Sequence, residues 1–170
     1  MDFIKLATDR FSTRDFSEKT IEAEKLEIIK EAAKIAPTAK NNQPQVVYLL
    51  KSKEALEKIR ENTRCSFNAP VVFAVCIDES KQWKQPYTGE YMGNVDAAIV
   101  TTHMMLAAES VGLGSCFVCY FDVDKFKKDF NVPNYITPVA LLPVGYKSSV
   151  CEPSERHFMR NKTEDFIFEL

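Results

Sequence analysis

The chain has 170 residues, of which 45% are apolar and 27% are charged, and its formal net charge is −2. This is the balance of an ordinary globular protein with one core, so we expect a single domain over residues 1–170. The small net charge argues against nucleic acid and anionic membranes as partners, and no apolar run is long enough for a membrane span. The opening residues, MDFIKLATDR, show no secretion signal, so we expect a cytoplasmic protein.

The first half of the chain contains patterns that are typical of helices and of strands. In residues 22–36, apolar side chains recur three and four positions apart, which predicts an amphipathic helix, and Pro37 ends it. The run PVVFAVCI at 70–77 is apolar without a break, as in a strand that is buried on both faces. The other patterns predict a helix over 2–9, a strand over 46–50, a helix over 54–62 and a polar loop over 79–93 that holds Trp83, Tyr87 and Tyr91.

The second half contains a long helix. Residues 94–112 are apolar almost all the way round, which is typical of a helix in the middle of a fold or at an interface, and His103 within it is expected to be a hydrogen-bonded core histidine. The later patterns predict a strand over 115–121, a short helix over 122–130 capped by Asp122, a strand over 137–146 and a polar tail from Lys147 onward. Helices and strands do not alternate strictly, and neither a G-x-G-x-x-G motif nor a P-loop is present. We therefore expect an α+β fold without a Rossmann-type nucleotide site.

The chain contains five cysteines, and this odd number favours free thiols. Only Cys116 and Cys119 have a C-x-x-C spacing, and no second pair completes a zinc site, so no metal is expected. In a strand, residues three apart face opposite sides, which argues against a working dithiol. A small thiol-redox protein that uses these two cysteines remains an alternative.

Two arginines bracket a serine near the beginning of the chain, in the stretch RFSTR. If this stretch is extended, Arg10, Ser12 and Arg14 face the same side. The planar fork of arginine suits a phosphate dianion, and the hydroxyl adds a donor. The same residues could instead form a solvated loop with Asp9 and Asp15.

Two further stretches could contact the same ligand. The loop APTAKNNQPQ at 36–45 offers amide and hydroxyl groups that can bond to carbonyls and ring nitrogens, although it could also be a plain turn between a helix and a strand. Late in the chain, Arg156, Arg160 and Lys162 form a basic cluster. This cluster could close on the anion held by the two early arginines, or it could remain a solvated tail.

Taken in this order, these segments resemble the FMN-dependent nitroreductase family. The family opens with Arg-x-Ser-x-Arg, present here as RFSTR, and continues with Ala-Pro-Ser-x-x-Asn-x-Gln-Pro, present here as APTAKNNQP with Thr38 in place of the serine. The stretches DAAIVTTHMMLAAESVGLGSC and PVALLPVGY also resemble those of its short, single-domain branch. The resemblance covers nearly the whole chain.

The resemblance implies an α+β, nitroreductase-like fold with a central, mainly antiparallel sheet flanked by helices. It also implies a homodimer in which the long helix is buried against the same helix of the other subunit. Two FMN sites would then lie between the subunits. Arg10, Ser12 and Arg14 would hold the FMN phosphate, and the loop from Pro37 to Asn41 would reach FMN from the other subunit. In full, the residues that the resemblance assigns to FMN are Arg10, Ser12, Arg14, Pro37, Thr38, Ala39, Asn41, Cys119, Tyr120, Arg156 and Arg160, with Arg160 the better match for the late phosphate contact.

The chain departs from the family pattern in three places. Gln45 replaces an aromatic residue, and Cys119 or Tyr120 replaces a glycine whose backbone lies beside flavin N5 in the family. A bulkier residue there would narrow the site and change the range of substrates. The late cluster RHFMRNKTED also differs from the usual Arg-Lys-Pro.

The activity implied by the resemblance is ping-pong hydride transfer from NADH or NADPH through flavin N5 to a small electrophilic acceptor, such as a nitroaromatic or a quinone. No catalytic side chain is expected, because the flavin carries the chemistry, while the backbone near Cys119 and Tyr120 could tune N5. Loop 79–93 could form a lid or wall of the pocket, or pack at the interface. One alternative is a flavin-binding storage or sensing protein without efficient turnover.

Overall fold

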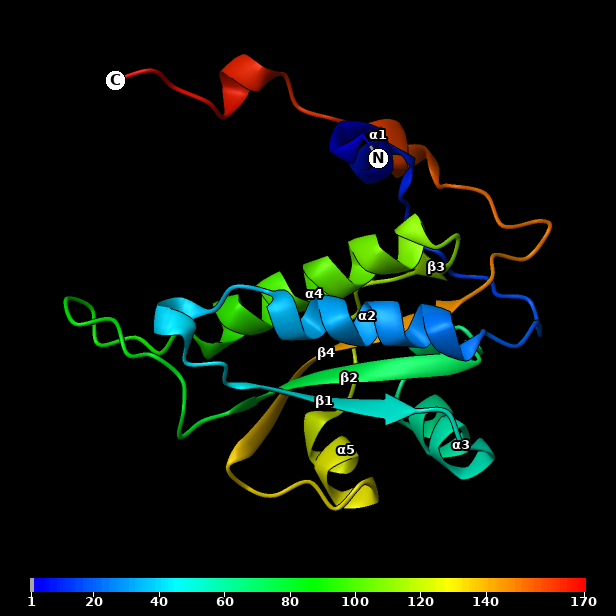
Figure 1. Cartoon of the computed structure of the whole chain (residues 1–170), viewed down its shortest axis with the longest axis horizontal. Coiled ribbons are helices and arrows are strands. Elements are labelled where there is room, and N and C mark those ends of the chain that lie inside the picture. Colours follow the sequence, from blue (N-terminus) through cyan, green and yellow to red (C-terminus); the bar gives the residue numbers. More distant parts are fainter. Residues whose placement is uncertain (1) are drawn as a thin grey trace.

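The computed structural model describes residues 2–170 and contains a four-stranded antiparallel sheet (Figure 1). The strands are β1 (Gln45–Leu50), β2 (Val71–Asp78), β3 (Gly114–Ser115) and β4 (Ile136–Gly145), in the order β1-β2-β4-β3. The α-helices are α1 (Phe3–Asp9), α2 (Ala23–Ile35), α3 (Lys53–Asn62), α4 (Gly93–Ser110) and α5 (Val123–Asp129), with short 3-10 turns at Ala39–Asn41, Arg64–Ser66, Glu155–Phe158 and Thr163–Asp165. The predicted α+β class and antiparallel sheet are therefore confirmed.

Helices cover both faces of the sheet. In Figure 1, α2 and α4 lie on one face, and α3 and α5 lie on the other. Phe73 of β2 belongs to the core that α2 and α4 form through Ile29 and Met104. Its neighbour Val72 belongs to the core on the opposite face, with Phe126. Successive side chains of a strand point to opposite faces, so β2 must be apolar at every position, and the prediction of a strand buried on both faces is confirmed.

Side chains next to the helices fix where they begin and end. Ser52 caps α3 by accepting a hydrogen bond of 3.2 Å from the Ala55 N–H. Asp122 caps α5 by accepting one of 2.9 Å from the Lys125 N–H, which confirms the predicted cap. Pro37 follows α2 and cannot continue it.

Helix α4 has an apolar side that the described residues leave uncovered. Val100 and Met104 are fully buried against α2 and the sheet. The opposite side is an open apolar groove of about 330 Å³, lined by Val95, Ala98, Ile99, Thr102 and His103. His103 Nδ1 lies 2.9 Å from the carbonyl oxygen of Ile99, so the predicted hydrogen bond is present, but the ring is half-buried beside this groove and not in the core.

The strand predicted over 115–121 is wrong for most of its length. Only Gly114 and Ser115 form β3, and beyond them Val118 makes an isolated bridge to Leu141 of β4. Pro143 of β4 explains the break. It accepts a bond of 3.3 Å from the Cys116 N–H but has no N–H to return, so the antiparallel ladder stops there.

The two cysteines of the C-x-x-C stretch lie in different environments. Cys116 is buried and Cys119 is exposed, and both are free thiols. Neither cysteine lies in a strand, so the argument from strand spacing does not apply, but their different burial gives no support to a dithiol. Over residues 2–170, no three metal-ligating side chains gather. Over the same residues, no helix has the length and apolar character needed to cross a membrane.

Burial of Cys76 makes stability depend on alkaline pH. Burial raises the pKa of its thiol from 9.0 to about 12, an effect that Lys127 reduces slightly. Between those values the unfolded thiol ionises while the folded thiol keeps its proton, so the free energy of unfolding falls as pH rises. The fall due to this thiol should be up to about 1.4 kcal/mol per pH unit, and Cys76→Ala should remove it. Urea unfolding of both proteins at several pH values checks this, and parallel curves above about pH 9 would contradict it.

Candidate functional site

The segment that carries the early arginines lies against the short edge strand. It follows α1 directly, and Ser12 forms a parallel bridge with Ser115 of β3. The Thr13 N–H donates a hydrogen bond of 2.9 Å to the Ser115 carbonyl. Ser12 is thereby placed beside the sheet, with an arginine on each side of it in the chain.

Close packing holds this segment in place. A Cβ atom at Gly114 would lie 2.8 Å from Thr13 Cγ2 and 2.9 Å from Lys147 Cγ, so no side chain fits there. Thr13 is fully buried, and over the described part of the chain its hydroxyl and that of Ser115 have no hydrogen-bond partner. The backbone of the segment is therefore fixed by contacts to β3 and Lys147. The Arg14 guanidinium donates a hydrogen bond of 3.2 Å to the Ser12 carbonyl and so stays beside the segment.

The early and the late arginines line one pocket. It has a volume of about 240 Å³ and is lined by Arg10, Phe11, Ser12, Arg14, Ser154, Arg156, His157 and Arg160. Residues 140 or more positions apart along the chain thus meet here. This is the arrangement that one anion site shared by the early and the late arginines would need. Lys162, also a candidate, is not among the lining residues.

The four arginines of this pocket carry no carboxylate partner within the described residues. Asp9 instead pairs with Lys5 at 2.6 Å, and Asp15 accepts a bond of 2.7 Å from the Ser148 hydroxyl. The alternative of a loop whose arginines pair with these aspartates is therefore wrong. Four fixed positive charges without a counter-ion among the described residues could hold an anion, and an oxyanion with several acceptors would suit them best.

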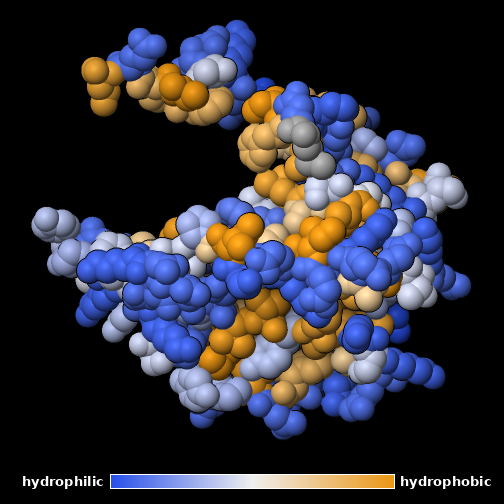
Figure 2. Space-filling view, in the orientation of Figure 1, coloured by the Kyte–Doolittle hydropathy of each residue, from blue (hydrophilic) through white to orange (hydrophobic). Residues whose placement is uncertain are grey.

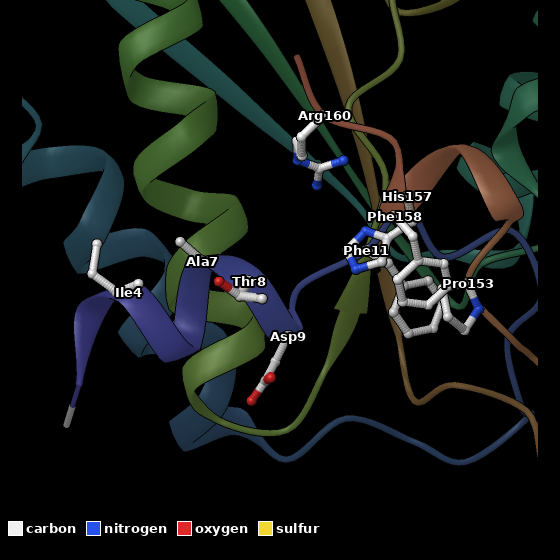
Figure 3. A pocket seen from close by; sticks show the side chains of 9 residues that line it. All are labelled: Ile4, Ala7, Thr8, Asp9, Phe11, Pro153, His157, Phe158 and Arg160. Carbon is white, nitrogen blue, oxygen red and sulfur yellow. The ribbon is translucent and has the colours of Figure 1, made fainter. Parts of the chain in front are cut away.

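A larger apolar groove adjoins the pocket (Figure 3). It has a volume of about 650 Å³ and is lined by Ile4, Ala7, Thr8, Asp9, Phe11, Pro153, His157, Phe158 and Arg160. Figure 3 shows Ile4 and Ala7 of α1 on one side of it and the rings of Phe11, His157 and Phe158 on the other. Sequence reasoning missed Phe11 and His157, which line both cavities and carry no motif signal of their own.

Side chains of the pocket affect the pKa of the Cys116 thiol. Burial raises the pKa of this thiol, and the nearby Arg14 guanidinium and Ser12 hydroxyl offset part of that shift. The backbone continues from Cys116 to Cys119 and Tyr120, which are both exposed. The Thr63 hydroxyl donates a hydrogen bond to the carbonyl of Tyr120 and holds this turn against the end of α3.

The loop with Pro37, Thr38, Ala39 and Asn41 is anchored elsewhere. The Ala39 N–H donates a hydrogen bond of 2.8 Å to Asp96 in the first turn of α4. Asp96 is only 1% exposed, and its second carboxylate oxygen has no partner within the described residues. Sequence reasoning missed it, although an acid in the first turn of an apolar helix was a visible signal.

Backbone conformation gives this loop its shape. Lys40, Asn41 and Gln43 have φ values of 52°, 55° and 51°, in the left-handed region that few residues other than glycine and asparagine adopt readily. The Thr38 hydroxyl accepts a bond of 3.0 Å from the Gln43 N–H and closes the turn.

Loop 79–93 lies beside this turn. The Asn42 side chain donates a hydrogen bond of 3.0 Å to the Lys81 carbonyl, and Lys40 lies 6.0 Å from the centre of the Trp83 ring. An antiparallel bridge between Lys84 and Tyr91 folds the loop back on itself. The two loops therefore form one surface at the amino end of α4.

The two groups of predicted site residues lie at opposite ends of α4 (Figure 1). The 36–45 loop is bonded to Asp96 at its amino end, whereas the arginine pocket adjoins β3, which follows its carboxyl end. Ser110 lies 14 positions after Asp96, which corresponds to about 21 Å along the helix. Within the described residues, the fold does not bring all the predicted site residues together.

The chain is similar to known proteins both in sequence and in structure. The family model described as Nitroreductase family matches residues 7–69 and 63–146. A solved nitroreductase family protein from Clostridium difficile 630 is 37% identical, with a TM-score of 0.93, and the match covers 99% of this chain and 98% of that one. An FMN reductase [NAD(P)H] from Bacillus subtilis is 28% identical over 163 residues, which cover 85% of this chain and 66% of that relative.

Proposed function

Because this chain belongs to the nitroreductase family, we propose that it is an FMN-dependent oxidoreductase that uses NADH or NADPH. When bound, FMN would take up a hydride from the reduced nicotinamide and deliver it to a small electrophilic acceptor, such as a nitroaromatic or a quinone. The names of two Bacillus subtilis relatives, both FMN reductases, support the choice of cofactor and of nicotinamide.

One observation carries this proposal: four arginines and a serine line one small pocket. The FMN phosphate is a dianion with several acceptor oxygens, and Arg10, Ser12 and Arg14 would hold it from one side. Arg156 and Arg160 would hold it from the other. The donor set and the lack of carboxylate partners, over residues 2–170, fit this group.

In this proposal, the residues assigned to FMN outside the arginine pocket would contact its flavin ring. The exposed backbone at Cys119 and Tyr120 would face its reactive edge, and the side chains there would narrow the acceptor pocket. No side chain of the chain is assigned a nucleophilic or acid–base role.

We also propose that residues 1–170 form a single domain, because both cores share the same sheet.

A second copy of the chain would complete each site. The loop with Pro37, Thr38, Ala39 and Asn41 is bonded to the amino end of α4, whereas the arginine pocket adjoins β3 beyond its carboxyl end, so the loop would reach FMN only from a partner. The apolar groove on the open side of α4 offers a surface for that partner. Loop 79–93 would then form a wall of the partner's pocket.

The carboxyl-terminal segment also supports a dimer. Figure 2 shows it projecting from the body of the protein, with apolar side chains near its tip. Phe166 is 60% exposed and Phe168 is 73% exposed, which leaves large apolar surfaces in water. Packing on a second copy would remove them from water.

The spectrum of the purified protein tests the cofactor and the reaction together. We expect a yellow protein whose heat-released pigment has the mass of FMN, and anaerobic NADH or NADPH should bleach it within the time of mixing. Added nitroaromatic or quinone should then restore the colour. A flavin that stays oxidised would support the storage or sensing alternative, and a colourless protein that takes up no FMN would contradict both.

The dimer has its own test. Sedimentation equilibrium of the full chain with FMN should give about twice the monomer mass of 19.4 kDa. A species of 19.4 kDa that holds FMN and is bleached by NADH would contradict the shared site and leave the oxidoreductase proposal standing.

A further inference from the structure

Lys40 has an unusual backbone conformation for a lysine. Its φ and ψ angles are 52° and 20°, in the left-handed region where a residue with a β-carbon is strained and glycine is not. The side chain is exposed, so burial of the lysine does not compensate for this strain. A strained residue must be held in place by its surroundings, and such residues are concentrated at functional sites.

Hydrogen bonds on both sides of Lys40 hold this conformation. On one side, the Ala39 N–H donates a bond of 2.8 Å to the buried carboxylate of Asp96. On the other side, the Asn41 N–H donates a bond of 2.9 Å to the Thr38 carbonyl. The backbone is therefore fixed before and after the lysine, and the loop presents the Lys40 side chain to solvent.

The Lys40 ammonium has no carboxylate partner within the described residues. Its aromatic neighbour is Trp83 of loop 79–93, whose ring centre lies 6.0 Å from Lys40 Nζ, at the outer limit of a cation–π contact. Figure 1 shows the 36–45 loop and loop 79–93 at the same end of the molecule. An unpaired positive charge thus lies beside an indole ring on this surface.

The proposed FMN site leaves the charge of Lys40 unused. The FMN phosphate is assigned to the arginine pocket, which lies beyond the other end of α4. Simple nitroaromatics and quinones have no ionised group for a lysine to bind. A nicotinamide dinucleotide, in contrast, carries a charged pyrophosphate, and NADPH carries a further phosphate on its ribose. Because the net charge of the chain is −2, such an anionic ligand needs a local cation to attract it.

We propose that Lys40 of one protomer binds a phosphate group of the reduced nicotinamide dinucleotide at the flavin site of the other protomer. This role rests on the FMN site and the dimer proposed above, because Lys40 lies between Ala39 and Asn41, which are assigned to the partner's FMN. The ammonium donates a charge-assisted hydrogen bond to a phosphate oxygen. Lys40 therefore favours hydride donors that carry a phosphate over uncharged ones.

Anaerobic bleaching of the FMN-loaded protein tests this role with three hydride donors. NADPH carries the pyrophosphate and the 2′-phosphate, NADH carries the pyrophosphate only, and 1-benzyl-1,4-dihydronicotinamide carries no phosphate. Lys40→Gln should raise the apparent dissociation constant for the dinucleotides about tenfold, the low end for a charge-assisted bond because the lysine is exposed. The uncharged donor should bleach both proteins at the same rate. Equal losses with NADPH and NADH indicate contact with the pyrophosphate, and a loss with NADPH alone indicates contact with the 2′-phosphate.

Binding is also measured without any reaction, because Trp83 is the only tryptophan in the sequence. Its fluorescence should change when NAD⁺ or NADP⁺ occupies the surface beside Lys40, and a titration gives the dissociation constant. We expect Lys40→Gln to weaken this binding about tenfold as well. Nicotinamide riboside, which has no phosphate, should bind equally to both proteins.

Two further variants separate the charge of Lys40 from the shape of its loop. Lys40→Arg keeps the charge and should retain most of the affinity for NADH. Lys40→Gly relieves the left-handed strain, so it would be harmless if only the loop shape mattered, but we expect it to lose as much affinity as Lys40→Gln. Lys51→Gln is the matched control and should behave as the wild type does, because Lys51 is an exposed lysine at the opposite end of β1 from the 36–45 loop.

Several outcomes would overturn the role of Lys40. Equal dissociation constants of the dinucleotides for the wild type and Lys40→Gln would do so, as would an equal loss with the uncharged donor, which would indicate a disturbed flavin site. Loss of bound FMN from Lys40→Gln, measured by its absorbance, would also contradict it. A variant that NADH bleaches as it does the wild type refutes the role of the lysine alone, whereas a wild-type protein that holds no FMN refutes the proposed function and this role with it.

Discussion

The double variant R10A/R14A should bind FMN about 100-fold more weakly than the wild-type chain. Each charge-assisted hydrogen bond contributes about 1.5–3 kcal/mol, and a loss of about 2.8 kcal/mol corresponds to 100-fold in affinity. Arg14 is exposed and Arg10 is half-buried, so solvent screening places the two contacts at the low end of that range. The affinity for riboflavin should change little, because it offers no phosphate to this pair.

Titration of flavin fluorescence against each protein measures both affinities. Arg60→Ala, which removes an exposed arginine from α3, is the control, and it should retain the wild-type affinity for FMN. Thermal unfolding of the double variant should stay close to that of the wild type, because neither arginine is part of the core. Undiminished binding of FMN in a folded double variant would refute the role of the pair.

Phe126→Ala should lower the free energy of unfolding by about 3–5 kcal/mol, the usual loss when a buried phenylalanine becomes a cavity. Phe126 of α5 is fully buried, and its ring lies 6.1 Å from that of Phe121 and 4.6 Å from that of Phe130. Phe121 follows Tyr120 directly, so the cavity would also loosen the turn that carries Cys119.

Urea unfolding measures this loss, and Tyr87→Ala is the matched control. Tyr87 is also aromatic but is 93% exposed, so its removal should change the free energy of unfolding by no more than about 0.5 kcal/mol. Equal effects of the two substitutions would mean that the core on the α3 and α5 side contributes little to stability.

The sequence predicted the elements whose local pattern and tertiary environment agree. The amphipathic spacing before Pro37 gave α2 to within a residue or two, and the unbroken apolar run gave β2. It failed over 115–121, where the residues favour a strand but Pro143 on the neighbouring strand interrupts the ladder. That failure has a physical reason: a strand needs a partner, and the partner is 27 residues away in the chain.

The anion pocket was predicted only in its parts. The alternation of Arg10, Ser12 and Arg14 indicated a phosphate clamp, and the late basic cluster was a second candidate for the same ligand. Arg156 and Arg160 line it where the rings of Phe11 and His157 meet edge to face, a contact that no spacing along the chain encodes. Asp96 shows the same limit, since its carboxylate serves a loop 57 residues earlier.

The sequence alone was therefore enough to predict the α+β class, the main helices and strands, the family and the residue types of the clamp. Each of these depends on neighbours within a few positions or on motifs in a fixed order. Tertiary structure alone decided which arginines share a pocket and which site residues lie at the far end of α4. These are contacts between distant segments, and they are set by how helices pack on a shared sheet, a property of the whole chain and not of any short stretch.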